Sequence, residues 1–373
     1  MSEILILAGA RTPFTAWRSG VTGAGAPGGA LKELDPWDLG SAALKGALAR
    51  AGMAPKDLGH LVFGNMYPEG PHGCYGARFV TLRAGCPVET TGTSVGIACG
   101  TGLLAVAEAA RVLERGEAKV AAAVGADSPS RARRDVFVPS FTDISCGKHI
   151  AKTAEERAQE KGFDRTAMDS WAKRSHERAK AAVKKRAEEI VPVAGVTDDD
   201  WIVDDPSLER LASVKPMFDD GPKSVTAANL HGIVDGGAAL VLASPKDFSG
   251  RALGRFVSSA VAGVPQERMA YAAVPAVRLA LERARWRVSD VDLWELNETF
   301  AAQVLLDRSE LGVFEERVNV NGGAIALGHP FGATGVRLVH TLLLELKRRN
   351  QRRGVAAISV GAGLGIALCV EAL

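Results

Sequence analysis

The sequence lacks the features that would assign it to a specialised class of protein. Its 373 residues carry a formal net charge of only +2, so no excess of either sign indicates a nucleic-acid or membrane-surface partner. Apolar residues make up 47% and charged residues 24%, and no low-complexity tract suggests disorder. A chain of this length is expected to form two or three packed units rather than one core.

Cysteine is scarce, and its pattern excludes two kinds of site. The five cysteines are scattered, with no CxxC pair and no zinc-site spacing of cysteine and histidine (Cys74, Cys86, Cys99, Cys146 and Cys369). An odd, scattered set is typical of a reducing compartment rather than of a disulfide framework. We therefore expect a cytoplasmic protein without a metal site.

The N-terminus has no long apolar run. The run from Ile4 to Ala8 is far too short to span a bilayer, and no basic region precedes it as in a signal peptide. We interpret it as a buried first strand and expect no membrane insertion.

A dinucleotide-binding fingerprint is also missing. Near the C-terminus Gly361, Gly363 and Gly365 alternate, which does not fit GxGxxG, and the residues after them continue as a strand. The pattern therefore argues against a dehydrogenase. Alternating glycines between strands instead suit a backbone that lies close to a ligand.

What is present is an alternation of apolar runs with amphipathic helical patterns, which predicts an α/β architecture. We expect helices over 38–51 and 102–115 and strands over 61–65 and 119–124. Between about residues 130 and 231 charged helices replace the short strands, with one long helix predicted over 165–189. We interpret this middle section as an inserted, more solvated subdomain.

An internal repeat is the most informative signal of organisation. The segment 47–63 matches 280–296 without a gap at an offset of 233. The same offset carries Thr101 onto Thr334, and Val124 falls on Val360 with three extra residues. The chain therefore resembles two similar α/β halves, with the charged section inserted in the first. Equivalent loops of the two halves would lie around a pseudo-twofold axis, where they could share a site.

Cys99 stands among small residues at the start of a predicted helix. Gly100 and Gly102 allow a tight turn there. A thiol at a helix N-terminus gains from the helix dipole and from free N–H groups, so we expect its pKa to fall toward the reactive range. A small buried residue is the competing interpretation, because cysteine is often buried.

Two further polar residues lie at the starts of predicted helices. His329 is in a glycine-rich loop and falls on Gly96 in the repeat, three residues before Cys99, which favours a functional role over a hydrogen-bonded loop histidine. Asn297 follows a strand and opens a helix, where an N-cap is the simpler interpretation.

His149 precedes another predicted helix start. Thr153 and Glu156, a few residues further on, have the spacing of a capping box. Helix initiation alone would therefore account for this segment.

Seven segments, in order along nearly the whole chain, carry a family resemblance. They are RTPF (11–14), ACGTGLLAV (98–106), KHIAKTAEE (148–156), KPMFDD (215–220), NETFAAQ (297–303), NVNGGAIALGHPFGATG (319–335) and GAGLGIALCVEAL (361–373). As a set they resemble the thiolase family, the acyl-CoA acyltransferases that make or cleave 3-ketoacyl-CoA. The resemblance implies an α/β, five-layer αβαβα fold of two duplicated halves with an inserted loop domain. The implied domains are 1–128 with 234–252, the loop domain 129–233, and 253–373.

The resemblance assigns a role to each matching residue. Cys99 would take the acyl group from one CoA thioester, and His329 would activate its thiol. His329 and a water held by Asn297 would bind the thioester oxygen of the second substrate. Backbone N–H groups of Cys99 and Gly361 would form the other oxyanion hole.

The resemblance also implies that acyl-CoA and CoA are substrates and that no resident cofactor is needed. The loop domain would bind CoA. The residues expected near its pantetheine or nucleotide are His149, Ile150, Lys215, Phe218, Ala227, His231 and Phe300.

The sequence departs from the family at one catalytic position. Thiolases usually have a second cysteine two residues before the GxG run, which moves the proton of acetyl-CoA; here that residue is Ser359. A serine hydroxyl is several units more basic than a thiol when deprotonated, so proton transfer through Ser359 is expected to cost several kcal/mol, at about 1.4 kcal/mol per unit. Acyl transfer onto Cys99 does not need this group. Cys369, ten residues on, is interpreted as packing.

Two smaller departures from the thiolase pattern also bear on how the protein works and assembles. His231 stands where the family commonly has a serine, and the section between Ser130 and His149 is shorter than usual, so a homodimer is as consistent as a homotetramer. Because of Ser359, two alternatives stand beside a thiolase-type C-acyltransferase. One is an acyl-CoA hydrolase, or transfer of the acyl group to another acceptor; the other is a non-catalytic acyl-CoA-binding protein.

Overall fold

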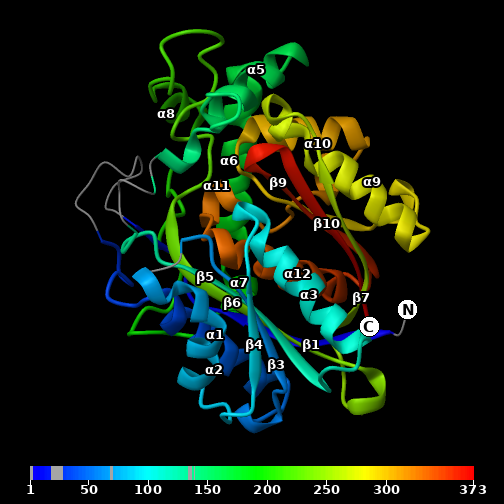
Figure 1. The fold of residues 1–373 in the computed structure, drawn as a ribbon. Helices are drawn as coiled ribbons and strands as arrows, with labels where there is room; N and C mark the ends of the chain where they lie inside the picture. Colours follow the sequence, from blue (N-terminus) through cyan, green and yellow to red (C-terminus); the bar gives the residue numbers. More distant parts are fainter. Residues whose placement is uncertain (1–2, 18–27, 68–69, 133–136, 138) are drawn as a thin grey trace.

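The computed structural model describes residues 3–17, 28–67, 70–132, 137 and 139–373 (Figure 1). Its strands pair in the order β4, β3, β5, β6, β1, β7, β10, β9, β8, with β2 beside β6. The strands are β1 (Ile4–Arg11), β2 (Thr15–Ala16), β3 (His60–Gly64), β4 (Thr91–Val95), β5 (Val120–Asp127), β6 (Val234–Ala243), β7 (Gly254–Gly263), β8 (Leu293–Leu296), β9 (Arg353–Val360) and β10 (Leu364–Ala372).

The two ends of this strand series have the same topology. In the first half β3 is parallel to β5, and β5, β6 and β1 follow as antiparallel neighbours. In the second half β8 is parallel to β9, and β9, β10 and β7 follow as antiparallel neighbours. The internal repeat therefore corresponds to a structural duplication.

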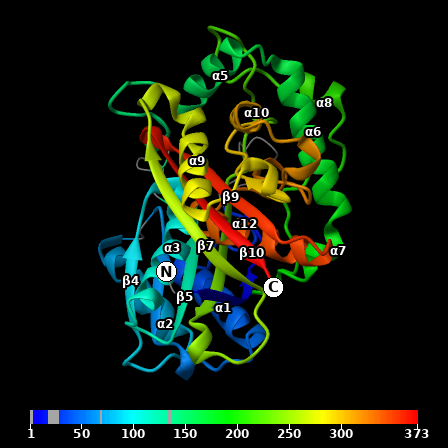
Figure 2. The same cartoon turned by 90° about the vertical axis from the view of Figure 1, so that its right-hand side faces the viewer.

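Helices cover both halves and separate them (Figures 1 and 2). Helices α3 (Thr101–Glu114) and α12 (Phe331–Arg348) pack against each other between the halves, while α1 (Pro36–Arg50) lies on the outer face of the first half and α9 (Ala273–Ala284) on that of the second. Also present are α2 (Gly76–Arg83), α10 (Ala301–Leu311) and α11 (Ala324–Leu327). The result is the predicted αβαβα order of layers.

Strand β5 shows how the sequence specifies these layers. Ala121 and Ala123 point into the core shared with α3 and α12, while Ala122 and Val124 point into the core shared with α1. Since successive side chains alternate between the faces of a strand, a strand covered on both faces is apolar throughout. This explains the uninterrupted apolar run at 120–124.

The central helices approach closely at equivalent glycines. A Cβ on Gly335 would lie 2.1 Å from the backbone nitrogen of Leu103, and a Cβ on Gly102 would lie 2.5 Å from the Gly332 carbonyl oxygen. Any side chain at either position would therefore push the two helix starts apart. Because Cys99 and His329 lie just before these starts, the glycines bring their loops together.

The predicted helices and strands at 38–51, 61–65, 102–115 and 119–124 are confirmed as α1, β3, α3 and β5. The long helix predicted over 165–189 is wrong, because it divides into α6 (Arg165–Ala181) and α7 (Val183–Ala187). Ala182 leaves the helical conformation with φ −91° and ψ 10°. The Arg186 side chain donates to the Ala179 carbonyl, one of those left open where α6 ends.

The middle section runs between β5 and β6 and contains α5 (Ile150–Glu160), α6, α7 and α8 (Leu208–Ala212). Helices α5 and α6 pack on α10, and α6 also packs on α11, so the section lies against the second half (Figure 2). The domain boundaries 128/129, 233/234 and 252/253 stay a prediction. Residues 133–136 and 138, in the section expected to bear on assembly, lie outside the described residues.

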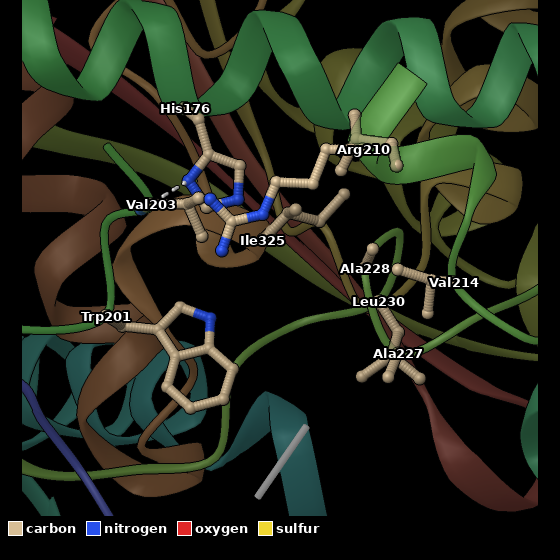
Figure 3. A pocket seen from close by; sticks show the side chains of 10 residues that line it. His176, Trp201, Val203, Arg210, Val214, Ala227, Ala228, Leu230 and Ile325 are labelled. Atoms are coloured by element: carbon tan, nitrogen blue, oxygen red, sulfur yellow. Dashed lines mark hydrogen bonds between the residues drawn. The ribbon is translucent and has the colours of Figure 1, made fainter. Parts of the chain in front are cut away.

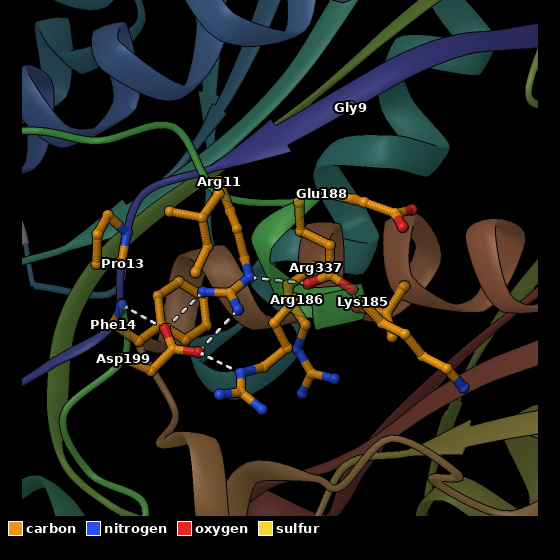
Figure 4. A network of polar contacts seen from close by, with 12 residues as sticks. Gly9, Arg11, Pro13, Phe14, Lys185, Arg186, Glu188, Asp199 and Arg337 are labelled. Atoms are coloured by element: carbon orange, nitrogen blue, oxygen red, sulfur yellow. Dashed lines mark hydrogen bonds and ion pairs between the residues drawn. The ribbon is translucent and has the colours of Figure 1, made fainter. Parts of the chain in front are cut away.

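A buried ion cluster ties the middle section to β1 (Figure 4). The guanidinium of Arg11 donates to both carboxylate oxygens of Asp199, at 2.7 and 2.9 Å, and to Glu189 at 2.9 Å. Burial alone would raise the pKa of Asp199, but Arg11 holds it below its usual value. The RTPF segment thus anchors the inserted section.

Candidate active site

Cys99 lies in a short 3-10 turn, Ala98–Gly100, immediately before α3. Its side chain is buried in a cluster with Phe331 at the start of α12 and Val360 at the end of β9. Ala98 has φ 47°, a left-handed conformation that is uncommon for a residue with a Cβ and is found preferentially at functional sites. The thiol is therefore held where the two halves meet.

The electrostatics of this thiol differ from the sequence-based expectation. Burial raises the pKa of Cys99 to about 12, although hydrogen bonds from the backbone N–H groups of Cys99 and Gly361 act to lower it. The predicted fall in pKa is therefore wrong, because desolvation outweighs the donors at the helix start. The thiol is therefore protonated at neutral pH and needs a base to become a nucleophile.

Gly361 has open space beside it. A Cβ built at this position meets no heavy atom within 4 Å. Its N–H group, already directed at the Cys99 sulfur, therefore borders a space that a ligand could fill.

His329 is fully buried, with its backbone N–H donating to the Gly232 carbonyl at 2.8 Å. Its Nδ1 lies 2.6 Å from Thr334 Oγ1, and that hydroxyl donates to the Pro330 carbonyl at 2.9 Å. Because the hydroxyl proton is already used, Thr334 accepts the proton of Nδ1. The lone pair of the ring is then on Nε2, which is available as a base.

The imidazole of His329 is neutral in this setting. Burial lowers its pKa well below the usual value, and the nearby His231 and Arg337 lower it further. A neutral ring with Nε2 unprotonated can accept the proton of a thiol.

Asn297 lies beside this imidazole. Its Nδ2 is 3.5 Å from His329 Nε2 and 3.0 Å from Thr299 Oγ1, while its buried Oδ1 has no hydrogen-bond partner among the described residues. The N-cap interpretation is wrong, because α10 begins at Ala301 and has Phe300 as its N-cap. Asn297 instead offers a donor and an acceptor to whatever binds next to His329.

Two buried carboxylates that the sequence analysis missed support these loops. Glu298 accepts from Trp171 Nε1 at 3.0 Å, Ser175 Oγ at 2.6 Å and Asn319 Nδ2 at 2.9 Å, so it joins α6 to the loop of Asn297. In the sequence, the only sign of this role was that Glu298 directly follows Asn297. The partners of Glu298 are too distant in sequence to be inferred from it.

Asp127, at the end of β5, is the second support. It accepts from the backbone N–H of Gly332 at 2.6 Å and from Asn65 Nδ2 at 2.9 Å, which fixes the start of α12. Burial raises the pKa of Asp127 to about 7.

Ser359 is fully buried on β9, and its Oγ accepts the backbone N–H of Ala273 at 2.9 Å. It shares a face of the strand with Val355 and Ala357, which pack in the core that contains α9. Within the described part of the chain, no hydrogen bond joins Ser359 to Cys99, His329 or Asn297. Cys369 is fully buried in the same core, which confirms its interpretation as packing.

A pocket of about 80 Å³ brings together four of the residues predicted to bind substrate. These are His149, Ile150, His231 and Phe300; the sequence analysis missed the other lining residues, which are Phe141, Met217, Leu230 and Ile233. Phe218 packs edge-on against His149, with the ring centroids 5.7 Å apart. Lys215 is exposed to solvent.

Ala227 lines a second, smaller pocket of about 30 Å³ that shares Leu230 with the first. In Figure 3 the rings of His176 and Trp201 and the side chain of Arg210 lie on one side of this pocket and Ala227 on the other. The structure therefore does not place Ala227 and Lys215 in the same pocket as His149.

His149 is the N-cap of α5, accepting the backbone N–H of Ala151 on Nδ1 at 3.1 Å. Helix initiation is thus confirmed for this segment. The capping box expected for Thr153 and Glu156 is wrong, because Thr153 is already inside the helix and donates to the Ile150 carbonyl at 2.8 Å.

Two kinds of feature are not found among the described residues. None of their helices combines the length and apolar character needed to cross a membrane. Nor do they contain a group of three His, Cys, Asp or Glu side chains able to hold a metal ion.

Two known domain families match this chain, one over its N-terminal part and one over its C-terminal part. The family described as thiolase, N-terminal domain matches residues 4–246, and thiolase, C-terminal domain matches residues 250–372. The chain belongs to the thiolase family.

Several relatives match over almost their whole length. An acetyl-CoA acetyltransferase of Shinella zoogloeoides is 37% identical, covering 97% of this chain and 100% of the relative. The cytosolic acetyl-CoA acetyltransferase of Mus musculus is 35% identical, covering 94% and 96%. Human mitochondrial 3-ketoacyl-CoA thiolase, solved in complex with CoA, superimposes on this thiolase with a TM-score of 0.93 at 31% identity, covering 100% and 98%.

Proposed function

We propose that this thiolase is an acyl-CoA C-acyltransferase that carries an acyl group on Cys99 and uses it in thiolytic cleavage or Claisen condensation of 3-ketoacyl-CoA. The observation that carries the proposal is that a buried thiol and a neutral imidazole lie just before two helix starts that pack against each other. The backbone N–H groups of Cys99 and Gly361 point at the Cys99 sulfur, and Thr334 holds His329 with Nε2 unprotonated. Relatives named acetyl-CoA acetyltransferase support the same reaction class.

In the first half-reaction His329 Nε2 takes the thiol proton of Cys99, and the thiolate attacks the carbonyl carbon of acyl-CoA. The negative charge on the thioester oxygen is stabilised by the N–H groups of Cys99 and Gly361, which the fold holds in place before the reaction. The CoA thiolate then leaves and takes up the proton from His329. Preorganised donors of this kind supply about 3 to 4 kcal/mol each.

The resemblance assigns the thioester oxygen of the other substrate to His329 and a water held by Asn297; with the lone pair of His329 on Nε2, the donors at this place are Asn297 Nδ2 and that water. The free Oδ1 of Asn297 is suited to accept from a water, which would add a donor beside the imidazole. The pocket lined by His149, His231 and Phe300 is suited to the pantetheine arm of CoA, since it is largely apolar and its His231 ring contacts the His329 ring. The human mitochondrial 3-ketoacyl-CoA thiolase solved in complex with CoA supports this ligand.

We also propose that the protein is a homodimer or homotetramer in the cytoplasm. Strand β4 supports an oligomer, because it ends the strand series, has β3 as its one partner strand among the described residues, and exposes the side chains of 91–94. An open edge strand without charged side chains is a ready surface for pairing with a second copy. The cytoplasmic location rests on the scattered cysteines of the sequence.

Acetoacetyl-CoA with CoA distinguishes this function from its alternatives. The proposal predicts two acetyl-CoA per acetoacetyl-CoA consumed, and the reverse condensation. A hydrolase would release free acid, and a non-catalytic protein would leave the substrate intact. Comparison with Ser359→Cys sharpens the result: C–C chemistry that appears only in this variant would favour the hydrolase or another acyl acceptor.

A further inference from the structure

The thiolysis and condensation proposed above need a group that moves the proton at C2 of acyl-CoA, and Ser359 is poorly suited to this. Its Oγ accepts the Ala273 N–H, and its face of β9 is directed at α9. A base for this step should instead be buried, border the acyl-CoA pocket and contact the residues that hold the thioester oxygen.

His231 meets these requirements. It lies on the segment between the two catalytic loops, because its backbone N–H donates to the Thr299 carbonyl at 3.2 Å while the next residue, Gly232, accepts from His329 N at 2.8 Å. Its ring is perpendicular to that of His329, with the centroids 4.9 Å apart. The same ring lines the pocket assigned to pantetheine.

The tautomer of this ring is fixed by its own backbone. Nδ1 lies 3.1 Å from the Gly232 carbonyl oxygen. Because a carbonyl oxygen can only accept a hydrogen bond, Nδ1 carries the proton and donates it. The lone pair is therefore on Nε2, and within the described residues Nε2 has no hydrogen-bond partner. Burial lowers the pKa of His231 to about 4, so the ring is in its unprotonated form at neutral pH.

We propose that His231 Nε2 is the base that removes and returns the proton at C2 of acyl-CoA, in the place of the thiol that Ser359 replaces. In condensation Nε2 takes this proton, and the C–H electron pair passes into the enolate. C2 then forms a bond to the carbonyl carbon of the acyl group on Cys99, while the bond from that carbon to sulfur breaks. The proton on His231 finally returns to the Cys99 thiolate, so both groups are neutral again.

Thiolysis runs through the same steps in reverse. The Cys99 thiol gives its proton to His231 as its sulfur attacks the 3-keto carbon, and the enolate that leaves when the C–C bond breaks takes this proton at C2. When the CoA thiol then attacks the acyl group on Cys99, its proton passes to the Cys99 thiolate that leaves. No oxidant or further reactant is needed in either direction. The inference rests on the proposed function, because it describes a step of that reaction.

Exchange of the C2 hydrogens of acetyl-CoA in D₂O isolates this step from C–C bond formation. We compare the wild type with His231→Ser and His231→Gln, the second of which keeps the pocket filled. His340→Gln is the matched control, since His340 is another buried histidine and lies on α12 against Gly9 of β1. Acylation of Cys99, followed by intact mass, is measured in parallel on all four proteins.

The inference predicts that exchange falls by about 10²-fold or more in both His231 variants and is kept in the control, while Cys99 is still acylated. Equal exchange in the wild type and both His231 variants would overturn the inference, as would a wild type that acylates Cys99 without exchange. A wild type that never acylates Cys99 would instead overturn the proposed function.

Discussion

The two halves of this thiolase use the same loop position for different tasks. Thr101 and Thr334 are equivalent in the repeat, and each lies at the start of a central helix. Thr101 Oγ1 accepts the backbone N–H of Ile97 at 2.8 Å and so shapes the turn of Cys99. Thr334 Oγ1 contacts the imidazole of His329 at 2.6 Å and so fixes its tautomer.

The difference shows how duplication can build a two-component site. The framework repeats, and equivalent glycines bring the two helix starts together, but only the first half carries a thiol and only the second a histidine at this place. Gly96 stands where His329 would repeat. Each half alone therefore supplies one partner of a nucleophile and base pair.

Removing the Cys99 thiol is expected to have the largest effect on activity, because it takes away the catalytic partner that the first half supplies. Cys99→Ala leaves His329 without a nucleophile to activate, so kcat/KM for thiolysis should fall by about 10⁴-fold or more. Cys369→Ala is the matched control, because that cysteine is buried in a core away from the site. Steady-state kinetics of both variants check this, and a small effect of Cys99→Ala would exclude covalent catalysis at this residue.

Arg11→Ala breaks the contact between the first half and the inserted section. Asp199 is fully buried and Glu189 nearly so, and the loss of Arg11 leaves them short of compensating charge. We expect the free energy of unfolding to fall by about 3 to 5 kcal/mol, measured by urea denaturation. Arg287→Ala, at an exposed ion pair with Asp290, is the control and is expected to leave the unfolding midpoint close to that of the wild type, because solvent screens this pair.

The equivalent threonines offer a direct test of the two tasks. Thr334→Val leaves the Nδ1–H of His329 without its acceptor, so the rate of Cys99 acylation should fall by about 10²-fold. Thr101→Val leaves the Ile97 N–H unpaired and is expected to lower the free energy of unfolding by about 1 to 3 kcal/mol, with a smaller effect on acylation. Rapid-quench kinetics and thermal unfolding separate the two outcomes. The same loss of acylation rate in both variants would show that the threonines act alike.

The smallest expected effect is on the pH dependence of stability, and it comes from His176, a buried histidine on α6. Burial lowers the pKa of His176 to about 4, so below pH 6.5 the unfolded chain binds a proton that the folded protein does not. This contribution to stability is present above pH 6.5 and is lost as the pH falls toward 4. Between pH 7 and 5 the wild type should lose about 2 kcal/mol more than His176→Gln. Denaturation at both pH values checks this, and identical losses would show that His176 is not buried in its neutral form.

The sequence predicted the framework well because its signals are local or repeat along the chain. The apolar run of β5 and the offset of 233 between Thr101 and Thr334 can both be found without knowing any contact. The environment of each catalytic group was harder to predict from the sequence. The raised pKa of Cys99 depends on burial by α12 and β9, and the supports Glu298 and Asp127 bind partners that are distant in sequence.

Asn297 illustrates the same limit. An asparagine before a helix pattern favours an N-cap, yet the helix begins four residues later, and the side chain lies beside His329 instead. Local propensity could not weigh this tertiary contact. The resemblance to thiolases supplied what the local pattern did not.

The central claim is that a thiol from one half and an imidazole from the other act as one site. Rapid-quench intact-mass spectrometry of Cys99 acylation by acetyl-CoA, in the wild type and in His329→Gln, tests it most directly. The account predicts one acetyl group on the Cys99 peptide, formed at least about 10²-fold more slowly in His329→Gln. An adduct on another residue, or equal rates in the two proteins, would contradict it.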